Sequence, residues 1–155
     1  MDETRMFSRL IRFETHCSRE MLESMKGLPA DQGHTFKLFA HVLESQIIWL
    51  ARLSGEEEVN EKWWPHLGYE GCRELQQRAE KSWDDFLAGM SLESLGRKVS
   101  YRLGNARAGV IVRDILVQLF VHASYLRGQI ALEMRGSGIN PPLPNYLGFS
   151  RLDGQ

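Results

Sequence analysis

The sequence predicts an all-α protein, an antiparallel four-helix bundle with a short extended hairpin between its third and fourth helices. Three observations lead to this prediction. Four long segments carry apolar residues at steps of three and four, the period of one helix face. Stretches rich in Gly, Pro or Glu separate these segments. Only one short stretch alternates apolar and polar residues as a strand does.

The first helix is expected to begin near Met6 and to end at Gly27. Its apolar face is formed by residues at helical spacing, namely Met6, Leu10, Phe13, Cys17, Met21 and Met25. Gly27 and Pro29 are typical of the end of a helix. Asp31 is the candidate N-cap of the helix that follows.

The second helix is predicted over residues 32–53, where apolar residues cover a broad face. Residues 54–68 break this periodicity and are predicted to form a loop. The loop contains the adjacent Trp63 and Trp64. Two large aromatic side chains in a loop usually cover a core or line a pocket, so both are candidate ligand-binding residues.

The third helix is predicted over residues 69–89 and the fourth over residues 112–135. Between them, Val99, Tyr101 and Leu103 alternate with polar residues before Gly104, which predicts the extended hairpin. The tail, residues 137–155, holds three of the five prolines. It is therefore expected to pack as an extended strap without regular helix.

Length and composition indicate a single globular domain spanning residues 1–155. The 155 residues are 43% hydrophobic and 25% charged, which excludes intrinsic disorder for most of the chain. No uncharged apolar run reaches the roughly 18 residues of a membrane span. The N-terminal residues also lack the basic-then-apolar layout of a signal peptide. We therefore expect a cytoplasmic protein.

The net charge and the cysteines exclude further classes of protein. Nineteen basic and twenty acidic residues give a formal charge of -1, which argues against a protein that neutralises many phosphates. With no candidate membrane span either, we expect neither nucleic-acid nor membrane partners. Cys17 and Cys72 both fall on apolar faces and are expected to be buried thiols, not a disulfide framework. The sequence holds no GxGxxG, HExxH, CxxC or GxSxG motif, so dinucleotide-binding, zincin, zinc-ribbon and α/β-hydrolase readings have no support.

Basic residues gather in residues 97–113 with no acid among them: Arg97, Lys98, Arg102, Arg107 and Arg113. Such a cluster can hold a small anionic ligand, with Arg97, Arg102 and Arg107 as candidate ligand-binding residues. Nucleic acid is a sharper alternative ligand for such a cluster. The remaining alternative is attraction to the acidic first part of the chain. This last interpretation is favoured on the sequence alone, because no recognition motif accompanies the cluster.

His41 and His122 each lie midway along a predicted helix among apolar residues. Helix bundles build metal sites from side chains on facing helices, so the pair is a candidate metal site. The competing interpretation, a core histidine hydrogen-bonded to a neighbour, is the more frequent one. His34 and His16 are expected to cap helices or face solvent, whereas His66 beside the tryptophans can reach a pocket from the loop.

Motifs along most of the chain resemble the DinB/YfiT-like superfamily of bacterial four-helix bundles, described as metal-dependent enzymes. The run from Gly33 to His41, followed by Trp49-Leu50-Ala51-Arg52-Leu53-Ser54-Gly55, is similar to the family's second helix. The most specific match is His122-Ala123-Ser124-Tyr125-Leu126-Arg127-Gly128-Gln129-Ile130 with the Pro-containing tail. Members usually show His-x-x-x-His-Arg-Gly-Gln-Ile at this place.

The resemblance implies a crossed connection order, a homodimer and a three-histidine site for a divalent metal such as zinc or nickel. By position, two of the ligands are His41 and His122, and the third falls on Leu126. Leucine cannot coordinate a metal. Gln118, Ser45 and His66 are candidate substitutes, although glutamine and serine are poor ligands for these metals. Gln129, in the same motif, is a candidate ligand-binding residue.

Two functions follow from these residues. The first is a metal-dependent enzyme, a transferase or isomerase that uses a low-molecular-weight thiol as in characterised members, or a hydrolase. The second is a metal-free module that binds a small ligand or a partner without catalysis. The loss of the third histidine at Leu126 favours the second.

Overall fold

The computed structural model describes residues 2–56 and 62–152 of the chain. The four long helices are α1 (Glu3–Ser24), α2 (Gly33–Leu53), α3 (Tyr69–Ala88) and α5 (Val112–Gly136). The short elements are η1 (Met25–Gly27), α4 (Leu92–Gly96), β1 (Lys98–Leu103), β2 (Ala106–Ile111) and α6 (Tyr146–Leu152). The protein is thus mostly helical, and the predicted all-α class is confirmed.

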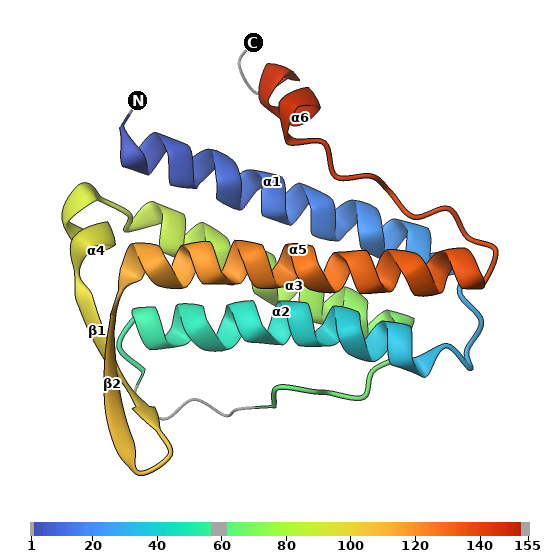
Figure 1. Cartoon of the computed structure of the whole chain (residues 1–155), viewed down its shortest axis with the longest axis horizontal. Helices are drawn as coiled ribbons and strands as arrows, with labels where there is room; N and C mark the ends of the chain where they lie inside the picture. Colours follow the sequence, from blue (N-terminus) through green and yellow to red (C-terminus); the bar gives the residue numbers. More distant parts are fainter. Residues whose placement is uncertain (1, 57–61, 153–155) are drawn as a thin grey trace.

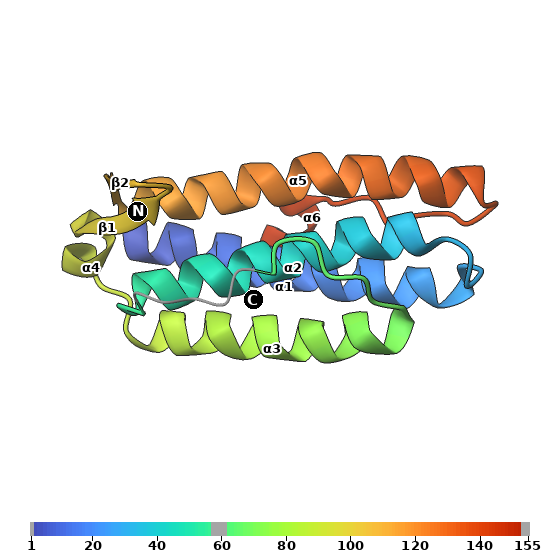
Figure 2. The same ribbon diagram turned by 90° about the horizontal axis from the view of Figure 1, so that it is seen from below.

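The four long helices lie side by side in three layers. α5 forms one outer layer and α3 the other, with α1 and α2 between them (Figures 1 and 2). α1 and α5 run in one direction, whereas α2 and α3 both run in the other (Figure 1). The neighbouring helices α2 and α3 are therefore parallel, so the predicted antiparallel arrangement does not extend to this pair. Residues 62–68, which lead into α3, run back along part of α2 (Figure 2).

Two predicted boundaries change. Asp2 caps α1, because its carboxylate accepts a hydrogen bond from the backbone N–H of Thr4 at 3.1 Å. The prediction that Asp31 caps α2 is wrong: the N-cap position is Gln32, whose side chain makes no capping hydrogen bond. Asp31 lies one residue too early, because the helix starts at Gly33.

The stretch before α5 is more regular than predicted. Residues 92–96, for which no helix was predicted, form α4, with a capping box in which the side chains of Ser91 and Ser94 each accept from the other's backbone N–H. β1 and β2 then pair antiparallel, with Lys98 opposite Ile111 and Leu103 opposite Ala106. Gly104 adopts a positive φ of 59° in the tight turn between them, a conformation that glycine adopts without strain.

The tail was expected to contain no helix, and α6 corrects this expectation. The prolines end at Pro144, so the residues from Tyr146 onward are free to form a helical turn. Phe13 of α1 holds α6 in place, with its ring centroid 5.2 Å from that of Tyr146 and 5.4 Å from that of Phe149. Residues 137–145 are not helical, in keeping with a strap.

Apolar side chains between the long helices form the core. The largest fully buried ones include Trp83, Phe39, Ile11 and Met21. Cys17 and Cys72 are free buried cysteines, as predicted. Burial raises the pKa of Cys17 to about 11 and that of Cys72 to about 12, so neither thiol is reactive at neutral pH.

One polar network crosses this core. The guanidinium of Arg127 on α5 donates to both carboxylate oxygens of Glu14 on α1, at 2.7 and 2.8 Å, and both side chains are buried. Gln46 of α2 donates to Glu14 at 2.8 Å and accepts from the Trp83 indole of α3 at 2.9 Å. Burial acts to lower the pKa of Arg127, but the facing Glu14 carboxylate outweighs it and the pKa is raised. The network therefore connects all four long helices around a charged pair.

Among the residues that the structure describes, the helix α5 is long and apolar enough to cross a membrane by length and hydropathy. Its inner side packs into the core and carries Arg127 in the ion pair with Glu14. Core helices of soluble proteins share these properties.

Candidate functional site

The structure brings His41 and His122 together. His41 lies on α2 and His122 on the facing side of α5, with ring centroids 5.0 Å apart and ring planes at 81°. His41 is 7% exposed, and His122 is partly exposed. This convergence of the two residues agrees with the positions that the resemblance implies.

Part of the loop before α3 covers His41. The Nδ1–H of His41 donates a hydrogen bond to the backbone carbonyl of Trp63, which leaves Nε2 without this proton. The Trp64 indole stacks on the imidazole, with centroids 3.6 Å apart and planes at 11°. Lys37 Nζ lies 5.9 Å from the centroid of the Trp64 ring. Trp63 and Trp64 were predicted to cover a core or line a pocket. In the structure they cover His41 of the histidine pair.

Burial lowers the pKa of both histidines, and for His122 the proximity of His41 lowers it further. Both imidazoles are therefore neutral at neutral pH. Glu44 on α2 shows the opposite effect, because burial raises the pKa of its carboxyl while Arg78 and Lys62 oppose this rise.

These shifts predict a pH dependence of stability. An imidazole titrates at about pH 6.5 in the unfolded chain and lower when folded, so the unfolded chain binds more protons as the pH falls below about 6.5. Above that pH both histidines are neutral in the folded and the unfolded chain, so they cost no stability. We therefore expect the free energy of unfolding to decrease as the pH is lowered from about 7 to about 5.5. Urea unfolding across this range measures the decrease.

The control is His41→Gln combined with His122→Gln, which should weaken the dependence of the urea midpoint on pH. The raised pKa of Glu44 acts in the opposite direction and is present in both proteins, so the comparison isolates the histidines. An unchanged pH dependence in the double variant would contradict the lowered histidine pKa values.

The residues around the pair do not fit a three-ligand metal site. Leu126, at the third position, is 5% exposed and packs in the apolar core. Within residues 2–56 and 62–152, no group of three or more His, Cys, Asp or Glu side chains could hold a metal ion. Catalytic zinc sites use three protein ligands and an open position, so two imidazoles fall one ligand short.

The candidate substitutes do not supply an evident third ligand. The Ser45 hydroxyl donates to the backbone carbonyl of His41 at 2.6 Å. Gln118, one turn before His122, is exposed, and so is His66 in the loop. Neither a serine hydroxyl nor a glutamine amide is a favourable ligand for zinc or nickel.

The basic residues predicted to bind an anion lie in a different place, a cleft between the hairpin and the C-terminal end of α2. We call this feature the cationic cleft. It has a volume of about 520 Å³ and is lined by Arg52, Gly55, Glu56, Arg97, Lys98, Val99, Ser100, Tyr101, Arg102, Asn105, Ala106 and Arg107. Five of these residues are cationic and one is acidic. Arg113 is not among them and instead pairs with Glu3 of α1 at 2.9 Å. This ion pair is of the kind expected if the basic cluster is attracted to the acidic first part of the chain.

Aromatic rings hold Arg52 at one wall of the cationic cleft. Its guanidinium carbon lies 4.6 Å from the ring centroid of Trp49, 5.4 Å from that of Tyr101 and 5.5 Å from that of Trp63. Trp63 therefore contacts both places, since its carbonyl accepts from His41 and its ring lies beside Arg52. Arg52 and Tyr101 were not predicted as site residues.

The other walls are also held by hydrogen bonds. Arg97 donates to the backbone carbonyl of Leu53 at 2.6 Å, and Arg107 donates to the Ser100 hydroxyl at 3.1 Å. Gln129, also predicted to bind a ligand, is partly exposed on α5 and is not among the described residues that line the cleft.

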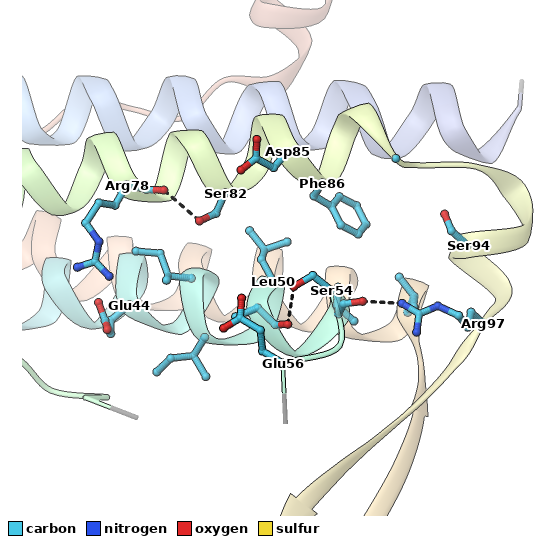
Figure 3. Close-up of a pocket in the computed structure, with 16 residues that line it drawn as sticks. Glu44, Leu50, Ser54, Glu56, Arg78, Ser82, Asp85, Phe86, Ser94 and Arg97 are labelled. Atoms are coloured by element: carbon cyan, nitrogen blue, oxygen red, sulfur yellow. Dashed lines mark hydrogen bonds between the residues drawn. The ribbon is translucent and has the colours of Figure 1, made fainter. Parts of the chain in front are cut away.

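A second cleft, of about 550 Å³, lies between α2 and α3 and shares Arg97 and Glu56 with the first. Glu44 and Arg78 lie at one end and Ser94 and Arg97 at the other, with Leu50 and Phe86 between them (Figure 3). The two clefts thus meet at the end of α2.

A family model described as DinB family matches residues 20–155. No curated protein matches the chain.

Proposed function

Because the chain belongs to the DinB family, we propose that it uses the family's helical frame to bind a small anionic molecule, without a catalytic metal. The observation that carries this proposal is the cationic cleft, whose described lining holds five cationic side chains and one carboxylate. A concave surface with one sign of charge attracts small ions of the opposite sign.

The arrangement of the four long helices supports a four-helix bundle of the DinB type. The resemblance to this family implies a crossed connection order. Here α2 and α3 run parallel, and residues 62–68 follow the side of α2 (Figure 2). The same crossing brings Trp63 and Trp64 to the histidine pair and Trp63 to Arg52. We also propose a cytoplasmic location.

The chemistry of the cleft favours a ligand with a carboxylate or phosphate group. Arginine offers several N–H donors in a planar fork, which suits the oxygens of these groups. The Tyr101 ring at the wall adds an apolar face. The expected ligand is therefore a small organic anion with a flat or apolar part.

Charge reversal in the cleft tests this proposal. We expect pyrophosphate, used as the probe, to bind the parent chain and to quench or shift the emission of Trp49 and Trp63, which lie beside Arg52. Lys98→Glu combined with Arg102→Glu should weaken binding at least about tenfold, because attraction at the wall becomes repulsion. Isothermal titration calorimetry measures the affinity, and added salt should reduce it.

Lys26→Glu is the control, since Lys26 is also exposed but lies on η1, where it pairs with Glu23 at 3.0 Å. It should bind pyrophosphate as the parent chain does. Equal binding by the parent chain and the Lys98/Arg102 double variant would contradict the proposal.

A second candidate is the metal-dependent thiol S-transferase or isomerase. The observation in its favour is that His41 donates its Nδ1 proton to a carbonyl, as histidines that ligate metals generally do, and so leaves Nε2 available. The two-imidazole donor set argues against it. Elemental analysis of protein purified without a His-tag distinguishes the two: stoichiometric zinc or nickel favours the enzyme, and its absence favours the binding module.

A further inference from the structure

The second cleft, of about 550 Å³ between α2 and α3, differs in charge from the cationic cleft. We call it the interhelix cleft. Its described lining holds three acidic side chains and two basic ones, namely Glu44, Glu56, Asp85, Arg78 and Arg97. Charges of both signs therefore surround this cleft, and a simple anion is not the ligand that it fits.

Glu44 lies at one end of the interhelix cleft with a carboxylate that has no partner. The residue is only 7% exposed. Among the described residues, no hydrogen bond or ion pair reaches this carboxylate. Arg78 and Lys62 act on it only at longer range, and burial raises its pKa in spite of them. Because buried carboxylates normally accept hydrogen bonds, this one indicates that a ligand supplies the donor.

Two side chains of α3 complete this end of the cleft. Figure 3 shows the guanidinium of Arg78 pointing toward the Glu44 carboxylate of α2. Ser82 lies one turn after Arg78 and lines the same cleft, and its hydroxyl donates to the Arg78 backbone carbonyl at 3.0 Å. With its proton used in this bond, the hydroxyl offers only lone pairs to the cleft. The end of the cleft thus presents two acceptors and one cationic donor.

We propose that the interhelix cleft binds an α-amino acid, with its ammonium group at Glu44 and Ser82 and its carboxylate at Arg78. A zwitterion fits because an anion alone would meet the Glu44 carboxylate, and an amine alone would meet the Arg78 guanidinium. The two charged groups of an α-amino acid are attached to one carbon, so both reach this end together. Both then form charge-assisted hydrogen bonds. This site does not depend on anion binding in the cationic cleft.

The rest of the interhelix cleft indicates the side chain of the amino acid. Leu50 and Phe86 lie between Glu44 and Arg97 (Figure 3). Arg97 donates to the carbonyl of Leu53, and from Glu44 to Leu53 the helix α2 rises by about 13.5 Å. This length accommodates a large apolar side chain, whose burial adds to the affinity. The expected ligand is an amino acid with an aromatic or long aliphatic side chain.

Three probes that share a phenyl ring test the proposal. L-Phenylalanine should bind the parent chain, whereas phenethylamine lacks the carboxylate and 3-phenylpropionate lacks the ammonium group. Each analogue should bind at least about tenfold more weakly, because it leaves one charged side chain of the cleft unsatisfied. Isothermal titration calorimetry measures the three affinities. No binding of L-phenylalanine, or an analogue that binds as tightly, would overturn the proposal.

Glu44→Gln and Arg78→Gln should each weaken the binding of L-phenylalanine at least about tenfold, because a neutral amide replaces a charged partner. Both variants should remain folded by circular dichroism, since neither side chain bonds to another within the described residues. Glu74→Gln is the matched control, because Glu74 is exposed on α3 and does not line the interhelix cleft. Its affinity should equal that of the parent chain. Undiminished binding by Glu44→Gln would overturn the proposal.

Variants of the two clefts distinguish this site from the proposed anion site. Glu44→Gln should bind pyrophosphate as the parent chain does. Lys98→Glu combined with Arg102→Glu should bind L-phenylalanine as the parent chain does, since neither residue lines the interhelix cleft. Loss of L-phenylalanine binding in this double variant would place the amino acid in the cationic cleft and overturn its assignment to the interhelix cleft.

Discussion

Replacing Arg127 with Met is expected to lower the free energy of unfolding by about 3 to 5 kcal/mol, the range for breaking a buried ion pair. The substitution leaves the Glu14 carboxylate buried between the helices with Gln46 as its main remaining donor. A buried charge without its counter-charge must either stay desolvated or take up a proton. Urea unfolding followed by circular dichroism measures the loss.

The double variant Glu14→Gln with Arg127→Met is the control for this prediction. It removes the charge but keeps an oxygen that can accept from Gln46, so the hydrogen bond from Trp83 to Gln46 can remain. We expect it to recover a large part of the stability that the single variant loses. If the double variant is no more stable than Arg127→Met, the loss comes from packing of the arginine side chain and not from the stranded charge.

The positions of the long helices could be read from the sequence, because each buries one face against the others. The apolar periodicity placed both ends of α2 and α3 within about one residue of the structure. Periodicity says nothing of direction. That α2 and α3 run parallel depends on the path of residues 54–68, which has no regular pattern to read.

The sequence carries a signal for the polar network in the core. Glu14 follows Ile11 by three residues and precedes Ser18 by four, so it lies on the buried face of α1. A carboxylate at such a position requires a buried cation. Arg127 is an arginine next to Leu126, on the apolar face of α5. A charged residue on the apolar face of each helix therefore predicts the Glu14–Arg127 ion pair.

The candidate site was predictable only in part. The resemblance placed His41 and His122 on facing helices, and they do converge. The basic cluster predicted Arg97, Arg102 and Arg107 together, and they line one cleft. Arg52 and Tyr101 could not be found in this way, because their contact joins α2 to a hairpin about fifty residues further along the chain.

Leu126→His is expected to complete a three-histidine metal site with His41 and His122. Residue 126 lies one helical turn after His122 on α5, so an imidazole there lies on the face that carries His122, which itself faces His41. Without metal, the buried imidazole should lower the free energy of unfolding by about 1 to 3 kcal/mol, because Leu126 now packs in the apolar core. Zinc or nickel should offset this loss, since an ion that binds only the folded chain stabilises it.

The measurement is the melting temperature of both proteins with and without metal, together with metal content by elemental analysis. Leu126→Gln is the matched control: it introduces a polar side chain at the same place and should be destabilised without rescue by metal, because an amide is a poor ligand for zinc. Adding His41→Gln to Leu126→His should also abolish the rescue, since one of three imidazoles is then lost. No metal-dependent stabilisation of Leu126→His would show that positions 41, 122 and 126 do not form a site. Stoichiometric metal in the parent chain would show that another residue completes the site there, and the S-transferase candidate would then replace the metal-free one.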